Sequence, residues 1–363
     1  MRHLTNFLPA LGSADPRRSY LVLVRESFPV LSLPESVRLE RISDAAAAAW
    51  LARITGDVVA LPLRLRREHF SAVVSLTNSG PIWSPVPHVL FQRNSLYYCP
   101  YYLDSISGWL ALETMIRRRL AVQSMKSADV VVTPSDAMAD MIRTSCPSIQ
   151  KARFRTLYHG FSRETLDDAL EHKYFKMLEA KRGALLFYPT HPAPHKGFEV
   201  LFEILAKLKA GGLEFQLATT ICLEDWPEVV YAYQNRVKEL GLQEHVIFMG
   251  VVPQRQMGAL YSMCDLMVYP SLCESFGFSM IEAMGHSVPI VAADTAVNRE
   301  MCGNGALYYP ALDPDAGADA VRAALEAPAR LRLIENGARR LSSFDWSWRR
   351  YAREFVSMLD EIC

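Results

Sequence analysis

The stretch that decides the fold is Pro270–Gly285, which reads Pro-Ser-Leu-Cys-Glu-Ser-Phe-Gly-Phe-Ser-Met-Ile-Glu-Ala-Met-Gly. It carries two carboxylates, Glu274 and Glu282, eight positions apart, with a Ser-Phe-Gly turn directly after the first. A strand-like run that closes with Val268-Tyr269 precedes it, and an apolar helical pattern surrounds Glu282. The segment therefore predicts a strand, a tight turn and a helix, with Glu274 in the loop and Glu282 about a turn into the helix.

The turn residues predict a phosphate site. The backbone amides around Ser275, Phe276 and Gly277 lie where a helix begins, and the first amides of a helix lack intrahelical partners and bind anions. Gly277 lets the backbone approach a ligand closely. Glu274 and Glu282 can then flank the anion site and accept hydrogen bonds from sugar hydroxyls. The alternative, equally compatible with the spacing, is an ordinary strand-to-helix connection with two exposed glutamates.

The stretch resembles the Glu-x7-Glu motif of retaining glycosyltransferases with the GT-B fold, in the family 4 group called glycosyl transferases group 1. The resemblance implies an α/β protein with two Rossmann-like, doubly wound domains that face a cleft, and a C-terminal helix that crosses back to the first domain. Four further segments resemble the family in the family's own order between residues 184 and 350, and these are His195–Phe198, His245–Gly250, Val288–Ala293 and Gly303–Pro310.

Short β-rich runs alternate with helical patterns along the whole chain, which is typical of parallel sheets covered by helices. We expect an acceptor-side domain at residues 1–162, a linker helix at 163–182, a nucleotide-sugar-binding domain at 183–344, and residues 345–363 crossing back. The expected strands are Tyr20–Val24, Ala72–Leu76, His88–Gln92, Val130–Thr133, Arg153–His159 and Ala184–Tyr188, and the expected helices are Asp44–Ile54, capped by Asp44, and Ile106–Met125.

The first residues of the sequence depart from the family pattern. Residues Arg2–Leu11 are helical in pattern and resemble the family's first helix, which in relatives follows a strand and a Gly-Gly loop. Neither is present here, so we expect the first strand of the N-terminal sheet and its Gly-loop to be missing. A start assigned too far downstream is the favoured explanation, and a truncation or a tolerated loss are the alternatives. An uncovered central strand edge would be prone to pair with other chains.

Composition excludes several classes of protein. The chain has 363 residues with 39 basic and 39 acidic side chains, so it has no general attraction to nucleic acid. Its seven cysteines are odd in number and never spaced Cys-x2-Cys, which argues against a disulfide framework or a zinc site. No apolar run is long enough to span a bilayer, and no signal-peptide core is present. We expect a cytoplasmic protein, with membrane association at the inner face as an option.

The resemblance also assigns roles to residues of the second domain. It implies that Glu282 holds the donor ribose and Glu274 the hydroxyls of the transferred sugar. The diphosphate then lies against Lys196 and the amides of residues 275–277. Gly250 and Val251 are implied to line the base pocket.

Lys196 and His191 bear on diphosphate binding. Lys196 begins a helix, where a cation opposes the helix dipole, so its placement favours a phosphate ligand over a solvated surface lysine. Relatives commonly carry arginine five positions before this lysine, and here that position is His191, which is charged only below a pKa near about 6.5. Pro192 and Pro194 exclude a helix that would bring His191 and His195 together as metal ligands. We expect no metal and no cofactor. Asp313-Pro314-Asp315 is predicted to be a turn with a helix cap.

The N-terminal domain offers weaker candidates for the acceptor site. Gln92, Arg93 and Asn94 follow an expected strand, and Asn78 and His159 lie at strand ends, where ligand sites of such sheets open. The alternative is that these polar residues only form hydrogen bonds with backbone groups, as most residues at strand ends do. Four tyrosines can form an acceptor wall or simply pack in the core, namely Tyr97, Tyr98, Tyr101 and Tyr102.

Two basic clusters lie on expected helices of the first domain. The second combines Arg117–Arg119 and Lys126 with an apolar side that includes Trp109 and Leu110, and such a helix can contact a membrane surface. The sequence favours the alternative that this apolar side is core. The first cluster consists of Arg64, Arg66 and Arg67.

The resemblance implies a retaining, metal-independent transferase that moves a sugar from a nucleotide-diphosphate sugar to a glycan, lipid-linked or small-molecule acceptor. The alternatives are a non-catalytic GT-B subunit of a glycosyltransferase complex, favoured by the absent Gly-loop and by His191, and a nucleotide-sugar epimerase or a phosphorylase. The pattern fits any donor base, because the base pocket is built largely from backbone.

Overall fold

The computed structural model describes residues 2–43, 56–149, 152–161, 169–179, 182–222, 224 and 226–363. The expected helix Asp44–Ile54 and its cap lie outside these residues. The described part forms two compact units. The first comprises Met1–Cys99, Ile106–Gly160 and Trp346–Cys363, and the second comprises Pro100–Ser105 and Phe161–Asp345.

The first unit contains two separate parallel sheets. Its elements in chain order are α1 (Arg2–Ala14), β1 (Tyr20–Arg25), β2 (Val37–Ile42), the π-helical turn η1 (Gly56–Ala60), α4 (Leu61–Arg67), β3 (Val73–Ser75), β4 (His88–Phe91), η2 (Ser95–Tyr97), α6 (Gly108–Ser127), β5 (Val130–Thr133), α7 (Asp136–Ser145), η3 (Pro147–Ile149), β6 (Phe154–Thr156) and α16 (Trp348–Asp360). Strands β1 and β2 pair with each other, and β3, β4, β5 and β6 form the second sheet in that order.

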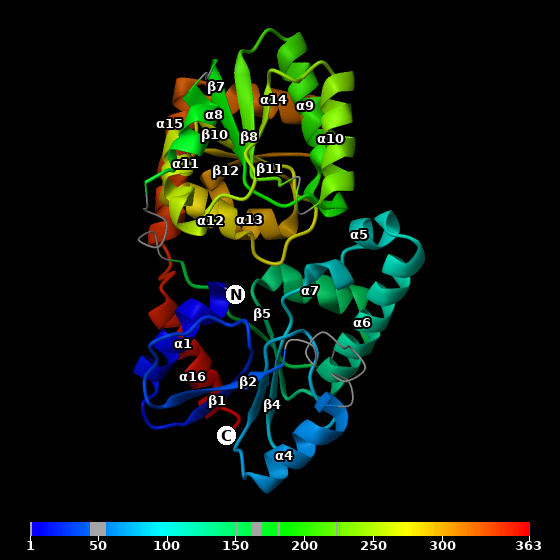
Figure 1. The fold of residues 1–363 in the computed structure, drawn as a ribbon, viewed down its shortest axis with the longest axis vertical. Coiled ribbons are helices and arrows are strands. Elements are labelled where there is room, and N and C mark those ends of the chain that lie inside the picture. Colours follow the sequence, from blue (N-terminus) through cyan, green and yellow to red (C-terminus); the bar gives the residue numbers. More distant parts are fainter. Residues whose placement is uncertain are drawn as a thin grey trace. The chain divides into compact units, whose positions relative to one another are not determined.

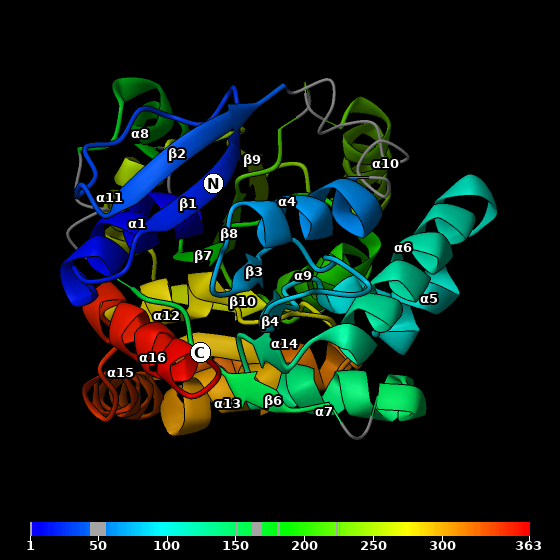
Figure 2. The same cartoon turned by 90° about the horizontal axis from the view of Figure 1, so that it is seen from below.

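Helices α1 and α16 join both sheets of the first unit through one core. They lie side by side in the two ribbon views (Figures 1 and 2). Phe7 and Leu8 of α1 and Phe355 of α16 pack in a cluster with Val24 of β1 and Val89 of β4. The two ends of the sequence are therefore held together by buried apolar side chains, which is the main favourable term in folding. The sequence predicted that residues 345–363 cross back to the first domain, and Trp346–Cys363 do belong to the first unit.

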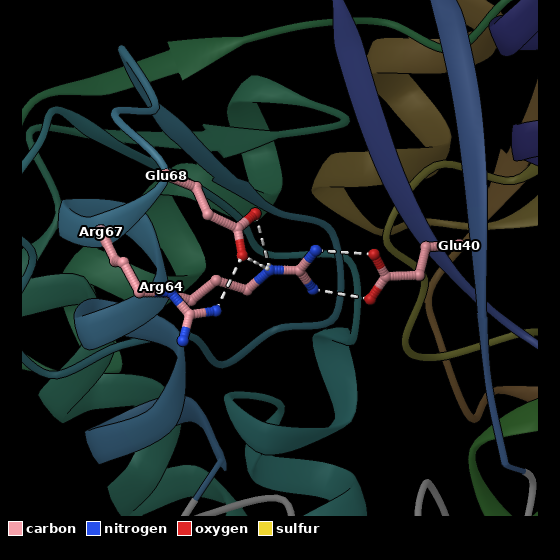
Figure 3. Close-up of polar contacts among 4 residues, drawn as sticks. All are labelled: Glu40, Arg64, Arg67 and Glu68. Carbon is pink, nitrogen blue, oxygen red and sulfur yellow. Dashed lines mark hydrogen bonds and ion pairs between the residues drawn. The ribbon is translucent and has the colours of Figure 1, made fainter.

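The break between the two sheets lies between β1 and β3, which do not pair in the described residues. An ion-pair network connects the two-stranded sheet to the helix that follows it (Figure 3). Arg64 of α4 donates to both carboxylate oxygens of Glu40 on β2, at 2.6 Å each, and its Nε lies 3.1 Å from both oxygens of Glu68. Arg67 also pairs with Glu68. Arg64 and Arg67 of the predicted basic cluster are thus neutralised by carboxylates.

The second unit is built on one six-stranded parallel sheet in the order β12-β11-β10-β7-β8-β9. Its elements are α5 (Pro100–Ser105), α8 (His172–Glu179), β7 (Ala184–Tyr188), η5 (Pro194–Lys196), α9 (Phe198–Ala210), β8 (Phe215–Thr219), α10 (Pro227–Glu239), β9 (Val246–Phe248), η6 (Gln254–Gln256), α11 (Met257–Met263), β10 (Leu266–Tyr269), α12 (Phe278–Gly285), β11 (Ile290–Ala293), α13 (Ala296–Cys302), η7 (Gly303–Gly305), β12 (Ala306–Tyr309), α14 (Pro314–Leu325) and α15 (Ala327–Ser342).

The central strands of this sheet are apolar and buried on both faces. All four residues of β10 and of β11 are buried, as expected for parallel strands covered by helices on each side. The strand order reverses direction at β7, which pairs with β8 on one side and with β10 on the other. Ligands of open parallel sheets bind at such a switch point, beyond the carboxyl ends of the strands.

The expected strands are present, and several are shorter than predicted. The clearest case is the strand expected at Arg153–His159, which covers only Phe154–Thr156. The helix expected at Ile106–Met125 is α6, Gly108–Ser127. The linker range 163–182 contains α8 in its described part. Asp313 is the N-cap of α14, and its carboxylate accepts hydrogen bonds from the amides of Asp315 and Ala316, so the predicted turn with a helix cap is confirmed.

Candidate active site

Two loops meet beyond the carboxyl ends of β7 and β10, at the switch point of the second unit. The amide of Leu272 in the second loop donates to the carbonyl of His195 in the first, at 2.9 Å. Gly197 ends the first loop with a φ of +67°, and a Cβ placed there would lie 2.5 Å from the carbonyl oxygen of Pro270. Only glycine fits this left-handed conformation and this close approach without strain. The backbone therefore fixes the distance between the two loops.

An ion pair joins the same two loops. Lys196 Nζ lies 2.6 Å from Glu274 Oε1, and the exposed fractions of the two side chains are 10% and 12%. Lys196 ends the turn η5 directly before the N-cap of α9. Its side chain is therefore not the solvated surface lysine that was the alternative, and Glu274 is likewise not an exposed glutamate. Removing one partner of a pair this buried leaves an uncompensated charge, which costs about 3–5 kcal/mol.

Glu274 Oε1 accepts two further hydrogen bonds. The hydroxyl of Tyr269 donates at 2.8 Å and that of Ser271 at 2.7 Å. Burial alone would raise the pKa of Glu274, but the charge of Lys196 and the three hydrogen bonds outweigh it and lower the pKa below its usual value. The carboxylate is therefore held ionised and in one orientation. All three donors contact the same oxygen atom.

The turn after Glu274 leads into α12 as predicted. Gly277 is the N-cap of the helix, with a φ of +84° and no side-chain capping hydrogen bond. The helix begins at Phe278, so the amides of residues 275–277 lie at its N-terminal end. Phe276 packs its ring against Phe278 and is buried, which fixes the path of the turn. The first amides of a helix are the backbone donors that anions favour.

Glu282 lies on α12 and points its carboxylate at polar groups from α11 and from the turn before it. The Tyr261 hydroxyl donates to Oε2 at 2.9 Å, and the Gln254 amide lies 3.3 Å from Oε1. Glu282 is only 3% exposed. The imidazole Nδ1 of His286 contacts the Glu282 carbonyl one turn further along, at 2.9 Å. Both carboxylates of the motif thus have partners that the sequence did not indicate, Tyr269 for Glu274 and Tyr261 for Glu282.

His191 and His195 both precede Lys196, and their rings lie near each other. Their ring centroids are 6.3 Å apart, and His191 also packs against Trp226. Loss of solvent and the neighbouring charge of Lys196 lower the pKa of both, and the pKa of His195 is about 3. Among the described residues, no group of three His, Cys, Asp or Glu side chains could hold a metal ion.

Gly250 and Val251 lie in the loop after β9, beside the η6 turn that carries Gln254. Gly250 has a φ of +75°, and its amide donates to the carbonyl of Ile221 at 3.0 Å. The Val251 side chain is exposed, and its carbonyl accepts from the Tyr174 hydroxyl on α8 at 2.6 Å. This loop therefore presents backbone at the same end of the sheet as Glu282, where the resemblance implies a base pocket.

The candidates of the first unit are mostly engaged in structural hydrogen bonds. Asn78 Oδ1 accepts from the amides of Arg93 and Asn94, at 2.6 and 2.9 Å. Gln92 is fully buried, donates to the Asn78 carbonyl and accepts from the Tyr98 hydroxyl. Asn94 Oδ1 caps the η2 turn. Asn78, Gln92 and Asn94 thus hold the loop after β4.

The four tyrosines are divided between the two units. Tyr97 and Tyr98 belong to the first unit, and the fully buried Tyr98 packs in its core. Tyr102 belongs to the second unit, where its ring contacts that of His195 edge-on. Tyr98 is therefore a packing residue, the alternative that the sequence left open. His159 is buried in the segment that follows β6, with its ring 5.0 Å from that of His3.

The apolar side of α6 is exposed, which corrects the expectation that it belongs to the core. Trp109 is 74% exposed, and Leu110, Leu112 and Met115 are also exposed. The buried residues of α6 are instead Thr114, Ala121, Ser124 and Met125. Arg117 pairs with Glu113, so part of the predicted basic cluster is neutralised. No helix among the described residues combines the length and apolar character that a bilayer crossing requires.

The fold is that of the two-unit parallel α/β enzymes of the GT-B class. Sucrose-phosphate synthase from Thermosynechococcus elongatus superposes with a TM-score of 0.74 at 17% identity, covering 98% of this chain and 91% of that one. Anabaena HepE, solved in complex with UDP, superposes with a TM-score of 0.69 at 16% identity, covering 98% and 95%.

The family comparison concerns the second unit. Residues 171–340 match the family model of the glycosyl transferases group 1. The O-antigen chain mannosyltransferase RfbU of Salmonella typhimurium is 24% identical over 237 residues, which are 65% of this chain and 61% of that protein. The chain thus spans less than two thirds of the length of that relative.

Proposed function

We propose that the protein is a retaining, metal-independent glycosyltransferase that takes a sugar from a nucleotide-diphosphate donor. The observation that carries the proposal is the Lys196–Glu274 pair, buried at the switch point beside the N-terminal amides of α12. A cation, a helix N-terminus and an ionised carboxylate at one place suit a diphosphate joined to a sugar.

The hydrogen-bonding positions that the Lys196–Glu274 pair leaves unused fit such a donor. An ammonium group has three donors, and Glu274 uses one of those of Lys196, so two are left for phosphate oxygens. The three hydrogen bonds that Glu274 receives all end on Oε1. Its Oε2 atom is left to accept from a hydroxyl of the transferred sugar. Glu282 accepts from the ribose hydroxyls, and the backbone around Gly250 and Val251 contacts the base.

The proposed chemistry is a front-face substitution at the anomeric carbon. The bond from that carbon to the diphosphate oxygen breaks, and the acceptor oxygen bonds to the same face. The acceptor proton passes to the departing diphosphate, so the protein supplies no separate base. Lys196 and the amides of residues 275–277 stabilise the negative charge that grows on the leaving group, which is the kind of electrostatic effect that accelerates such reactions most. Glu274 orients the sugar.

The donor half of the proposal is tested by a thermal-shift panel of UDP, GDP, ADP, CDP and dTDP with their sugars, first in EDTA and then with magnesium. A ligand present at 100 times its Kd stabilises the folded state by about 2.7 kcal/mol, which a melting curve detects. We expect one base to raise the melting temperature without metal. The Glu282→Ala variant should lose that shift, while Glu326→Ala, at the N-cap of α15, should retain it. If no nucleotide shifts the wild type, the donor proposal is wrong and a non-catalytic role gains support.

We further propose that the acceptor is a glycan or a lipid-linked saccharide, and that α6 touches the membrane that carries it. The exposed Trp109 and Leu110 at the start of α6, with Arg119 and Lys126 further along the helix, support this proposal. Apolar side chains flanked by basic ones bind anionic bilayers at their surface.

A further inference from the structure

Arg93 stands at the carboxyl end of β4 in the first unit, in a loop with a fixed backbone. Its amide donates to Asn78 Oδ1 at 2.6 Å, and Asn78 itself has a φ of +64°. Its neighbour Gln92 is fully buried and hydrogen-bonded at both ends of its amide. These hydrogen bonds therefore fix the backbone of Arg93, and its guanidinium takes no part in them.

That guanidinium is partly buried and has no anionic partner among the described residues. Burial lowers the pKa of Arg93, and among the described residues the group that favours its charged form is the hydroxyl of Tyr351, not a carboxylate. No hydrogen bond or ion pair of its side chain occurs in the described part of the chain. Two other arginines that reach into this unit are paired, Arg64 with Glu40 and Arg350 with Glu354. Arg93 differs from them because its charge is uncompensated.

Two buried polar side chains, those of His3 and Tyr351, interact electrostatically with Arg93. The imidazole Nε2 of His3 on α1 lies 2.7 Å from the hydroxyl of Tyr351 on α16. His3 is 4% exposed, and its Nδ1 has no hydrogen-bond partner within the described ranges. Burial and the charge of Arg93 lower the pKa of His3 well below its ordinary value, so the ring is neutral. When Tyr351 donates to Nε2, the proton of the neutral ring is on Nδ1, which is then an available donor.

Uncompensated charge in a desolvated place costs free energy unless an anion is bound. The carboxyl ends of parallel strands are also where such sheets bind ligands. We propose that Arg93, with His3 as a neighbouring donor, binds an oxyanion, either a phosphate or a carboxylate group. Guanidinium binds both in the same two-pronged geometry. On the proposed function, on which this step rests, the oxyanion is carried by the acceptor, so the acceptor is an acidic or phosphorylated molecule.

The test follows the Arg93 side chain directly by NMR of arginine Nε–Hε groups in the full-length protein. Inorganic phosphate and, separately, acetate are titrated to roughly 50 mM, because a single arginine site is expected to bind in the millimolar range. Sodium chloride holds the ionic strength constant. Arg93→Gln assigns the signal, and Arg93→Lys does so if the first variant does not fold. Arg119, an exposed arginine on α6, is assigned in the same way by Arg119→Gln and serves as the control.

We expect the Arg93 signal to shift and saturate while that of Arg119 changes little and linearly. Saturation with phosphate alone assigns a phosphorylated ligand, and saturation with both anions extends the site to carboxylates. Equal, unsaturated shifts of both arginines would mean only a general ion atmosphere, and that result or no shift at all overturns the proposal. The titration reports on Arg93 in the first unit and requires no nucleotide-sugar donor. Its failure therefore differs from a failure of the nucleotide panel, which concerns the second unit.

Discussion

The hydroxyl of Tyr269 donates a hydrogen bond of 2.8 Å to Oε1 of Glu274. Tyr269 is the last residue of β10, so the central strand itself fixes the carboxylate that begins the motif. The same oxygen receives Lys196 and Ser271, and this arrangement keeps Oε2 available. A side chain outside the motif thus positions the motif's first residue.

Replacing Tyr269 by phenylalanine should weaken turnover. A hydrogen bond to a charged group contributes about 1.5–3 kcal/mol, which corresponds to a loss of roughly 10–100-fold if the bond is worth as much in the transition state. The pKa of Glu274 should also rise toward its usual value, so the acid limb of the pH–rate profile should move to higher pH. Tyr309→Phe is the matched control, because Tyr309 ends the strand β12 and its buried hydroxyl has no hydrogen-bond partner in the described residues. Equal activity and equal pH profiles for the two variants would contradict the positioning role.

Gly197→Ala should push the two site loops apart. The added Cβ would lie 2.5 Å from the Pro270 carbonyl, in addition to the strain of φ at +67°. Gly212→Ala has a similar strain, since Gly212 has a φ of +77°, but no atom lies within 4 Å of its added Cβ. We expect the strain alone to cost about 1–2 kcal/mol in both variants. Only Gly197→Ala should lose more stability than this in urea unfolding and bind nucleotide more weakly. Indistinguishable variants would show that the loops are free to move.

His195 should make the protein less stable in acid. Its pKa in the folded state is about 3, against an ordinary value of 6.5, so between these pH values the unfolded chain binds a proton that the folded chain does not. Stability is therefore lost as the pH falls from about 6.5 toward 3, by at most about 1.4 kcal/mol per pH unit for this group. His195→Asn should show a smaller decrease between pH 7 and pH 5 in urea unfolding. An unchanged decrease would assign the acid sensitivity to other groups.

The exposed start of α6 should bind anionic vesicles. Sedimentation with vesicles of phosphatidylglycerol and phosphatidylcholine should capture the wild type, and capture should decrease at high salt, which screens the basic residues. Trp109→Ser with Leu110→Ser should lower the partition coefficient onto vesicles at least about 100-fold, because burial of both side chains contributes about 1.5–3 kcal/mol each and every 1.4 kcal/mol is tenfold. The control replaces the exposed Val229 and Tyr231 of α10 by serine. Equal capture of both double variants would remove α6 from the membrane contact.

The sequence predicted those features that depend on neighbouring residues. The strand, turn and helix of residues 268–285 follow from local periodicity, and the structure confirms them. The pairing of Lys196 with Glu274 joins residues 78 positions apart, so it depends on the strand order, which the periodicity does not encode. The sequence did not reveal the role of Tyr269 for a different reason. Tyr269 reads as an ordinary apolar strand residue until its hydroxyl is seen to reach the carboxylate.

The error at α6 has a physical cause. Hydropathy selected its large apolar residues as the buried side, whereas the helix buries small ones that allow close approach. Ser124 both donates to the Gly80 carbonyl and accepts from the Gly80 amide, at 2.9 and 3.1 Å. Such a contact requires a short polar side chain at the interface. Large residues such as Trp109 remain at the surface, and no periodicity distinguishes this arrangement from its reverse.

The central claim is that this chain transfers a sugar from a nucleotide diphosphate with retention and without metal. It is tested most directly by a proton NMR time course in EDTA, using the nucleotide sugar that the thermal-shift panel selects, with water or an added acceptor to receive the sugar. We predict release of the nucleoside diphosphate and a first-formed product with the anomeric configuration of the donor, both lost in Glu274→Gln. A first-formed product of inverted configuration, or release that requires magnesium, would contradict the account.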